Sequence, residues 1–228
     1  MTKPRILAAA IGAAGLMVLL GATGAGGVLR WALIWIGLAC GVASFAYLTN
    51  QPSWIGKREG RLVWWRVLPV APYVLAYGIA AWVRRARRRY AAWDEIAPRV
   101  FVGARLPAAE LPRGAQWVVD LTAELPEIAD VRRLAGYRSL PALDGATPPD
   151  EERFLGLLEE LSEAEGGVYL HCISGRGRAP TAAAALLIAR GVAPDAPTAF
   201  EIVRKGRPAS APNATDVAFV ERISTRLR

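Results

Sequence analysis

Three long apolar stretches dominate the first part of the chain. Residues 6–28 are apolar and uncharged over more positions than the roughly 20 that a membrane-spanning helix needs. Residues 31–48 continue this character after a short glycine-rich break, so the two stretches together suit a helical hairpin. A polar loop at residues 51–61 leads to a third stretch, residues 62–83, which is interrupted by Arg66 and two prolines. The pattern predicts two to three transmembrane helices.

The pattern changes near Asp94, where short β-favouring runs begin to alternate with helical ones. Strands are expected at residues 99–103, 116–122, 137–140 and 168–170. Helices are expected at residues 150–165, 181–190, 197–204 and 215–226. This alternation predicts an α/β fold with a mostly parallel sheet and helices on both of its faces. We therefore divide the chain into a membrane region, 1–93, and a globular domain, 94–228.

The distribution of charge agrees with this division. Residues 1–93 carry 12 Lys/Arg and one acidic residue, whereas residues 94–228 carry 16 Lys/Arg and 19 acidic residues. The net charge of +8 therefore belongs to the flanks of the apolar stretches. Because the globular domain has no basic excess, the sequence argues against nucleic acid as a partner. The two cysteines provide neither a disulfide framework nor a metal cluster.

Basic clusters also predict the orientation in the membrane. The densest of them, residues 84–89, follows the third apolar stretch and places the globular domain in the cytoplasm by the positive-inside rule. Hydropathy favours three spans, which would put the N-terminus outside. Two spans, with residues 62–83 interfacial or re-entrant, would keep every basic cluster inside. A cleaved signal peptide fits less well, because the first stretch is long and more apolar sequence follows at once.

The main candidate for chemistry is the loop between the strand at 168–170 and the helix at 181–190. It contains Cys172 and, six positions later, Arg178. The free N–H groups of such a strand-to-helix loop, together with the helix dipole, form a cradle for an anion. A thiolate beside a guanidinium and a helix N-terminus is a nucleophile near neutral pH. A guanidinium can also bind two phosphate oxygens at once.

The remaining loop residues have supporting roles in this interpretation. Five of them are expected to line the phosphate-binding cradle: Ile173, Ser174, Gly175, Arg176 and Gly177. The two glycines permit backbone dihedrals that turn amides inward. His171 is the only histidine, so it lacks a histidine partner for a metal site and is expected to support the loop by hydrogen bonding. The plainer alternative is a buried cysteine in an ordinary glycine-rich loop.

The motif His-Cys-Ile-Ser-Gly-Arg-Gly-Arg-Ala-Pro resembles the signature of cysteine-dependent dual-specificity phosphatases, and most closely that of the phosphatases of regenerating liver. The resemblance covers about residues 95–225. It implies hydrolysis of phosphate monoesters through a phosphocysteine intermediate, with no metal or other cofactor. Most relatives have Ser or Thr at the position of Ala179, where the hydroxyl helps the cysteine to leave. Alanine here implies slower breakdown of the intermediate.

A second segment resembles the same family. Asp144 lies in Leu-Pro-Ala-Leu-Asp-Gly-Ala-Thr-Pro-Pro, which is similar to the acid loop of these phosphatases. The resemblance implies that Asp144 is the general acid, although an Asp-Gly pair is also a common turn. Asp120 is expected to be structural. Asn213 and Asp216 fall where relatives sometimes have a residue that positions water, and we assign them no role.

The substrate is expected at the membrane, since a tethered domain gains effective concentration only there. The first hypothesis is a membrane lipid phosphate, such as phosphatidylglycerophosphate or a phosphoinositide-like lipid. The second is a phosphotyrosine or phosphoserine/threonine protein. The third follows from Ala179: a slow-turnover domain that acts mainly as a binding partner of an integral membrane protein, as the regenerating-liver phosphatases do with magnesium-transport proteins.

Overall fold

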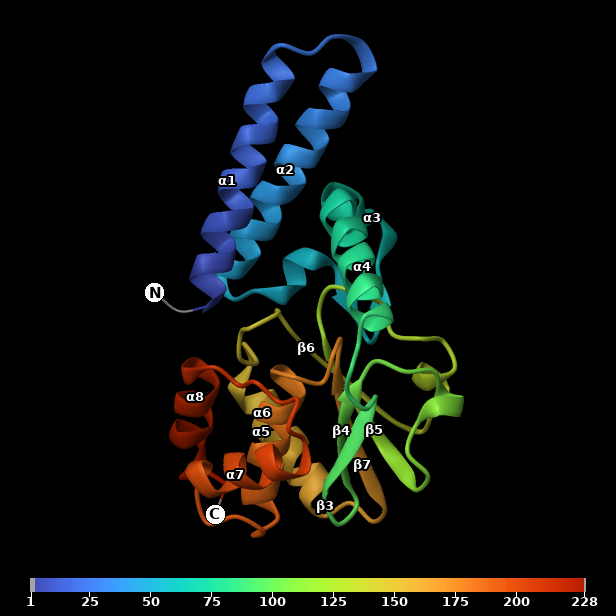
Figure 1. The fold of residues 1–228 in the computed structure, drawn as a ribbon, viewed down its shortest axis with the longest axis vertical. Coiled ribbons are helices and arrows are strands. Elements are labelled where there is room, and N and C mark those ends of the chain that lie inside the picture. The colour runs from blue at the N-terminus through green and yellow to red at the C-terminus, as the bar shows by residue number, and fades with distance from the viewer. Residues whose placement is uncertain (1–2, 228) are drawn as a thin grey trace.

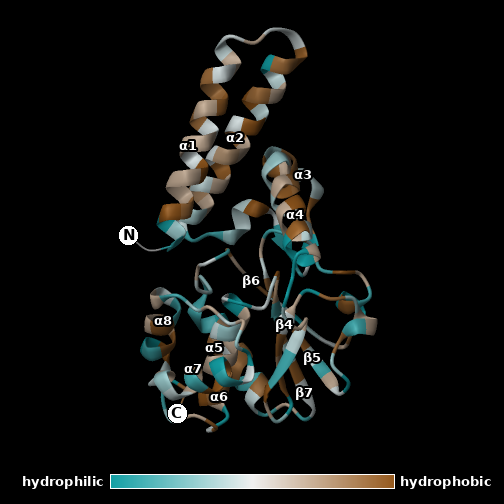
Figure 2. Ribbon diagram, viewed as in Figure 1, coloured by the Kyte–Doolittle hydropathy of each residue, from teal (hydrophilic) through white to brown (hydrophobic). Residues whose placement is uncertain are grey.

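The computed structural model describes residues 3–227, and Figure 1 shows a long helical hairpin standing on an α/β part. Helices α1 (Lys3–Thr23) and α2 (Gly27–Thr49) form the hairpin. They pack closely through small residues, since a Cβ added to Gly15 would lie 2.7 Å from the Cβ of Cys40. Large apolar side chains such as Leu16, Met17 and Trp31 are exposed, and the hairpin is mainly apolar in Figure 2.

Three helical stretches are long and apolar enough to cross a membrane by length and composition: Lys3–Thr23, Gly27–Thr49 and Trp64–Ala86. The 21 residues of α1 reach about 31 Å at 1.5 Å per residue, which matches a hydrocarbon core of about 30 Å. The third stretch is broken by its prolines into α3 (Trp64–Val67), η2 (Leu68–Val70) and α4 (Ala71–Ala86).

The third stretch contacts the α/β part both just before its start, at Gly60, and within α4, at Tyr77. Just before it, the carbonyl of Gly60 accepts a hydrogen bond from the Glu127 amide (2.7 Å), so this end lies on the α/β part. Its middle lies against α2, where Trp35 Nε1 donates to the Leu68 carbonyl (3.1 Å). By Tyr77 it contacts the α/β part again. All three stretches remain candidate spans by length and composition.

The α/β part contains a five-stranded sheet in the order β3-β4-β7-β5-β6. The strands are β3 (Trp93–Ala97), β4 (Val100–Ala104), β5 (Ala115–Thr122), β6 (Gly136–Ala142) and β7 (Gly167–Cys172). The central pairings are parallel, as predicted, and only β3 pairs antiparallel, with β4. The sequence analysis missed β3, which begins beside the boundary predicted at Asp94.

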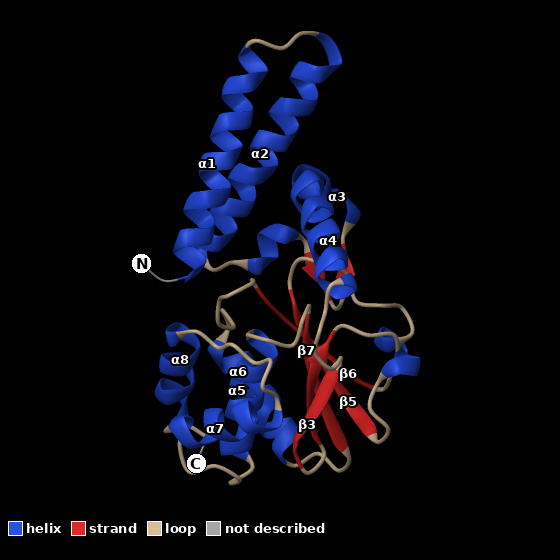
Figure 3. Cartoon of the chain, viewed as in Figure 1, coloured by secondary structure: helices blue, strands red, loops and turns tan. Residues whose placement is uncertain are grey.

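Four helices cover one face of this sheet, as Figure 3 shows. They are α5 (Glu151–Ser162), α6 (Arg178–Ala189), α7 (Ala196–Gly206) and α8 (Ala214–Ser224). On the other face Phe101, Val118 and Tyr169 pack against residues of the loops that contain η3 (Ala108–Glu110) and η4 (Val131–Arg133). The predicted fold class is confirmed, but the expectation of helices on both faces is wrong, because loops with short 3₁₀ turns cover the second face.

The polar loop after α2 forms a small hairpin that docks on the α/β part. Strands β1 (Lys57–Arg58) and β2 (Arg61–Leu62) are joined by Glu59 and Gly60, both with positive φ (47° and 76°), as a type I′ turn requires. The Lys57 ammonium is buried and lies 2.6 Å from the Asp120 carboxylate. Burial alone would raise the pKa of Asp120, but Lys57, with His171, holds it below its usual value.

Replacing Lys57 by methionine is expected to destabilise the full-length protein by about 3–5 kcal/mol, because the Asp120 carboxylate would stay buried without its partner. For a chain of this size the midpoint of thermal unfolding in detergent should fall by roughly 6–20 °C. The control is Lys205→Met, which breaks an exposed pair with Glu201 and should shift the midpoint by only about 1–3 °C. An equal shift in both variants would contradict the docking of the hairpin.

Candidate active site

The predicted loop lies at the carboxyl edge of the sheet, between the end of central strand β7 at Cys172 and the start of α6 at Arg178. Parallel α/β sheets bind ligands at this edge. Gly175 has a φ of +66°, and a Cβ added to it would lie 2.5 Å from the backbone of Gly103, so only glycine fits there. Gly177 has a negative φ (−116°) and is the N-cap of α6.

Carbonyl groups of this loop are bound by a buried arginine, whereas its N–H groups are unpaired among the described residues. Arg207, whose side chain is fully buried, donates from Nε to the Gly175 carbonyl (2.7 Å) and from an Nη to the Ser174 carbonyl (3.3 Å). Within residues 3–227 the N–H groups of residues 174–177 donate to no protein acceptor. Bound carbonyls and unpaired amides are features that an anion cradle needs, and the phosphate-binding role of this loop stays a prediction.

The guanidinium of Arg178 is fixed along one side. Its Nη1 donates to the Ala142 carbonyl (2.6 Å), to the Leu121 carbonyl (3.3 Å) and to the Glu124 carboxylate (2.9 Å). Burial would lower the pKa of Arg178, but Glu124 and the other acidic neighbours hold it well above its usual value. Its Nη2 donates to the Tyr77 hydroxyl (3.2 Å), and its buried Nε is the donor that has no partner among the described residues.

Glu124 organises the site, and the sequence analysis missed it. Besides Arg178, this fully buried carboxylate accepts hydrogen bonds from the backbone N–H of Asp144 (2.7 Å) and from the Tyr47 hydroxyl of α2 (3.2 Å). The available signal was its position just after β5, at the same carboxyl edge of the sheet as Cys172. Arg207 carried no comparable signal, because it acts from a distant loop.

Asp144 lies beside the arginine, as the phosphatase interpretation requires. Its carboxylate is 3.7 Å from an Nη of Arg178 and accepts a hydrogen bond from the Tyr77 hydroxyl of α4 (3.3 Å). Burial would raise the pKa of Asp144, but Arg178, Arg84 and Lys3 outweigh burial and hold the pKa below its usual value. These cations therefore favour the charged form of the Asp144 carboxyl group.

A pocket of about 220 Å³ lies between the acid loop and the Cys172 loop. Its lining contains five of the predicted site residues, namely Asp144, Cys172, Ser174, Arg176 and Gly177. Arg178, Gly175, Ile173 and His171 are not among the residues that line it, and Arg178 is buried beside Asp144. The other lining residues are Gly145, Ala211, Asn213, Asp216 and, from the N-terminal helices, Lys3 and Arg84. A larger hollow of about 900 Å³ lies at the opposite edge of the sheet, near Gly114 and Gly167, away from Cys172.

Asn213 and Asp216, which line the pocket, also form the capping box at the start of α8. Asn213 caps α8 and donates from its side-chain amide to the Gly145 carbonyl (3.3 Å), which ties α8 to the acid loop. Asp216 is largely buried, and burial raises its pKa to about 6. Ala179, in the first turn of α6, is fully buried.

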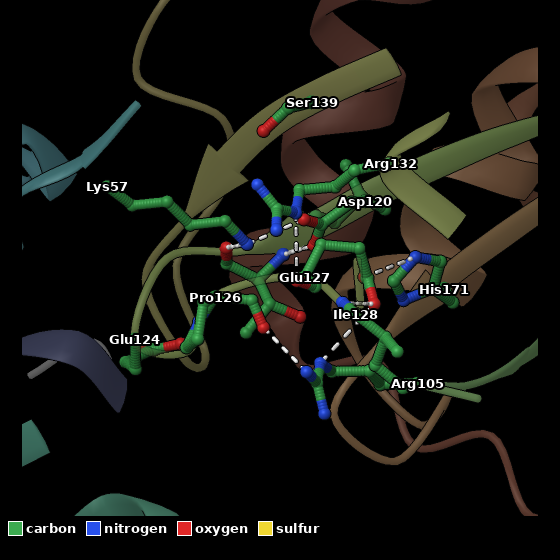
Figure 4. A network of polar contacts seen from close by, with 12 residues as sticks. Lys57, Arg105, Asp120, Glu124, Pro126, Glu127, Ile128, Arg132, Ser139 and His171 are labelled. Atoms are coloured by element: carbon green, nitrogen blue, oxygen red, sulfur yellow. Dashed lines mark hydrogen bonds and ion pairs between the residues drawn. The ribbon is translucent and has the colours of Figure 1, made fainter. Parts of the chain in front are cut away.

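His171 belongs to a buried network of charges beneath the loop (Figure 4). Its Nε2 lies 3.1 Å from the Glu127 carboxylate, which also pairs with Arg105 (3.4 Å). Asp120, Glu127 and His171 lie close enough together to bind a cation. However, the two carboxylates already pair with Arg105 and Lys57, so their charge is balanced by the protein itself. Among the described residues the His171 side chain contacts Glu127 and makes no hydrogen bond to the loop, and its Nδ1 has no partner, so its support of the loop stays a prediction.

Comparison with protein families decides the identity of the α/β part. Residues 108–220 match the model described as "Swiss Army Knife protein, DSP-PTPase phosphatase domain". This range includes Asp144, Cys172 and Arg178. Residues 108–220 are a phosphatase domain of the dual-specificity family.

Solved structures show the same fold for this phosphatase domain. A mutant form of the phosphatase Tk-PTP superposes with a TM-score of 0.50 at 26% identity, covering 60% of this chain and 96% of that one. Human DUSP28 gives a TM-score of 0.50 at 18% identity, covering 60% of this chain and 95% of that one. No curated protein matches the chain.

Replacing Glu124 by glutamine is expected to lower kcat/KM of the phosphatase by roughly 10- to 100-fold, because Arg178 and the acid loop lose a charged hydrogen-bond partner. Hydrolysis of p-nitrophenyl phosphate by the full-length protein measures this. The control is Glu160→Gln, which breaks a half-exposed pair with Arg138 far from the pocket. Equal rates for the two variants would show that Glu124 does not position the arginine.

Proposed function

We propose that the protein is a membrane-anchored phosphatase that hydrolyses a membrane lipid phosphate monoester through a phosphocysteine intermediate. The cradle amides and Arg178 bind the phosphate dianion. The Cys172 thiolate attacks phosphorus, so that a P–S bond forms as the P–O bond to the alcohol breaks. Asp144 gives its proton to the leaving oxygen.

The second half of the reaction regenerates the thiolate. Asp144, now a carboxylate, takes a proton from water. The resulting oxygen nucleophile attacks phosphorus and breaks the P–S bond, which releases inorganic phosphate and the Cys172 thiolate. The cradle and Arg178 stabilise the phosphoryl charge in both steps. These roles, with those of Ser174, Gly175, Arg176 and Gly177 in the cradle, rest on the family resemblance and on the shared pocket.

The observation that favours a lipid substrate is the origin of the pocket lining. Lys3 begins α1, and Arg84 lies near the end of α4, yet both line the pocket that contains Cys172. If the hairpin of α1 and α2 crosses the bilayer, the mouth of the pocket lies at headgroup level. A phosphate carried by a lipid would then meet the thiolate without leaving the membrane.

We further propose that the chain crosses the membrane twice, with the third apolar stretch re-entrant and the phosphatase domain in the cytoplasm. Lys3, the β1–β2 hairpin and Arg84 all lie on the side of the phosphatase domain. Because all of these basic groups lie on one side, the positive-inside rule assigns that side to the cytoplasm.

Two other functions fit part of the site. The same tether would bring phosphotyrosine or phosphoserine/threonine proteins of the membrane to the pocket. Ala179 supports the third hypothesis, a slow-turnover domain that binds an integral membrane protein, since no hydroxyl is present there to assist the leaving thiolate.

Phosphate release from vesicles tests the proposal. The full-length protein would be given vesicles that contain a panel of lipid phosphates and, in parallel, a phosphotyrosine peptide, with Cys172→Ser as the blank. Sustained, Cys172-dependent release from a lipid supports the lipid phosphatase. Release from the peptide alone would favour a protein phosphatase, and a single burst with trapped phosphocysteine would favour the slow-turnover binding domain.

A further inference from the structure

Two cations from the N-terminal helices line the catalytic pocket without an ion-pair partner. Within residues 3–227, neither Lys3 nor Arg84 has a carboxylate within 4 Å. The guanidinium of Arg84 lies over the Tyr77 ring, 5.3 Å from its centroid, which fixes its position without neutralising its charge. The neighbouring Arg85, in contrast, pairs with Glu110.

Lys3 is placed by close packing on the acid loop. A Cβ added to Gly145 would lie 2.9–3.2 Å from three carbons of the lysine side chain. The aliphatic part of Lys3 therefore covers this loop, and its ammonium is left at the pocket. Both Lys3 and Arg84 act electrostatically on Asp144, but the closest cation to that carboxylate is Arg178.

The phosphate monoester does not require these two charges. The cradle amides and Arg178 already receive it, and Asp144 is uncharged when it donates its proton. With substrate bound, Asp216 would be the carboxyl group left in the lining beside Lys3 and Arg84, and since burial raises its pKa to about 6, the two cations would exceed the negative charge around them. Charges in such a position favour a second anion close to the first.

We infer that Lys3 and Arg84 form a subsite for a second anionic group of the substrate, a phosphodiester between the terminal phosphate monoester and the acyl chains. This inference rests on the proposed lipid phosphatase activity. The pocket of about 220 Å³ is smaller than the roughly 300–1,000 Å³ of sites that enclose drug-sized ligands, so it holds a headgroup and leaves acyl chains outside. The subsite selects against phosphatidic acid, whose monoester is attached directly to the diacylglycerol.

The test compares substrates that differ in the second anion. Full-length wild type, Lys3→Gln and Arg84→Gln would be reconstituted in vesicles of neutral lipid that contain either phosphatidylglycerophosphate or phosphatidic acid. In each variant the ratio of kcat/KM for the first lipid to that for the second should fall roughly tenfold, the value of one charged hydrogen bond. Arg5→Gln and Arg85→Gln, which remove a charge from the same helices outside the pocket, should leave this ratio within about twofold.

Other outcomes would separate the inference from the proposed function. Equal losses on both lipids would overturn the subsite and show that the two cations only position the acid loop. Cys172-dependent hydrolysis of p-nitrophenyl phosphate with no release from either lipid would instead overturn the lipid phosphatase itself. The deacylated headgroup, glycerophosphoglycerophosphate, tests whether the substrate must be in the membrane. If the free headgroup is hydrolysed as efficiently as the lipid, the proposal that the substrate is a membrane lipid is refuted.

Discussion

Replacing Cys172 by serine is expected to reduce phosphate release from every substrate by at least about 10⁴-fold. An alcohol is far less nucleophilic than a thiolate near neutral pH, and a phosphoserine at this position would be a poor leaving group in the second step. The cysteine is buried, and serine has almost the same shape, so the fold should persist. Release of inorganic phosphate by the full-length protein measures the loss.

The control for this variant is its stability. A midpoint of thermal unfolding close to that of wild type would assign the loss of activity to chemistry rather than to unfolding. Cys40, the other cysteine, lies in α2 away from the pocket, and Cys40→Ser should keep most of the activity. Substantial release by the Cys172→Ser variant would contradict the phosphocysteine mechanism.

Replacing Asp144 by asparagine should have the next largest effect, roughly 10²- to 10⁴-fold in kcat, but only for substrates with a poor leaving group. An alkoxide needs a proton to leave, whereas p-nitrophenolate leaves readily without one. The variant should therefore lose far more activity on a lipid phosphate than on p-nitrophenyl phosphate. An equal loss on both substrates would show that Asp144 is structural, as in an ordinary Asp-Gly turn.

The pH dependence of kcat/KM is a second test of Asp144 as the general acid. The general acid is active when protonated, and Arg178, Arg84 and Lys3 outweigh burial to hold the pKa of Asp144 below its usual value. On a lipid phosphate, kcat/KM should therefore fall as the pH rises above that pKa. The falling limb should disappear in Asp144→Asn, while the limb set by ionisation of the substrate phosphate should remain.

The centre of the site could be predicted because its signal is local. Cys172, Arg178 and the loop glycines lie within one strand–loop–helix unit, and the helix simply begins at Arg178, earlier than hydrophobic spacing suggests. The supporting residues could not be predicted in this way. Tyr77 reaches Arg178 across 101 positions of sequence, and Lys57 reaches Asp120 across 63, so no short window contains both partners.

One strand of the sheet was not predicted from the sequence, and the path of one apolar stretch was left open. Strand β3 (Trp93–Ala97) is polar in part and has an irregular register with β4, so it lacks the apolar run that identifies a buried strand. For residues 62–83, hydropathy measures only how apolar the stretch is, so the three-span and two-span predictions both stay open. The contact of Leu68 with α2 is a detail of the path that hydropathy cannot predict.

The docking of the N-terminal helices on the pocket has a consequence for how the enzyme would search for its substrate. A domain on a flexible linker samples a volume set by the length of that linker, and accepts targets at many heights above the bilayer. Here Lys3 and Arg84 line the pocket itself, so if α1 and α2 cross the bilayer, the fold fixes the distance from Cys172 Sγ to the membrane. The protein would then select phosphates by their height above the bilayer as well as by their chemistry. A phosphate on a cytoplasmic domain far from the membrane would not reach the pocket.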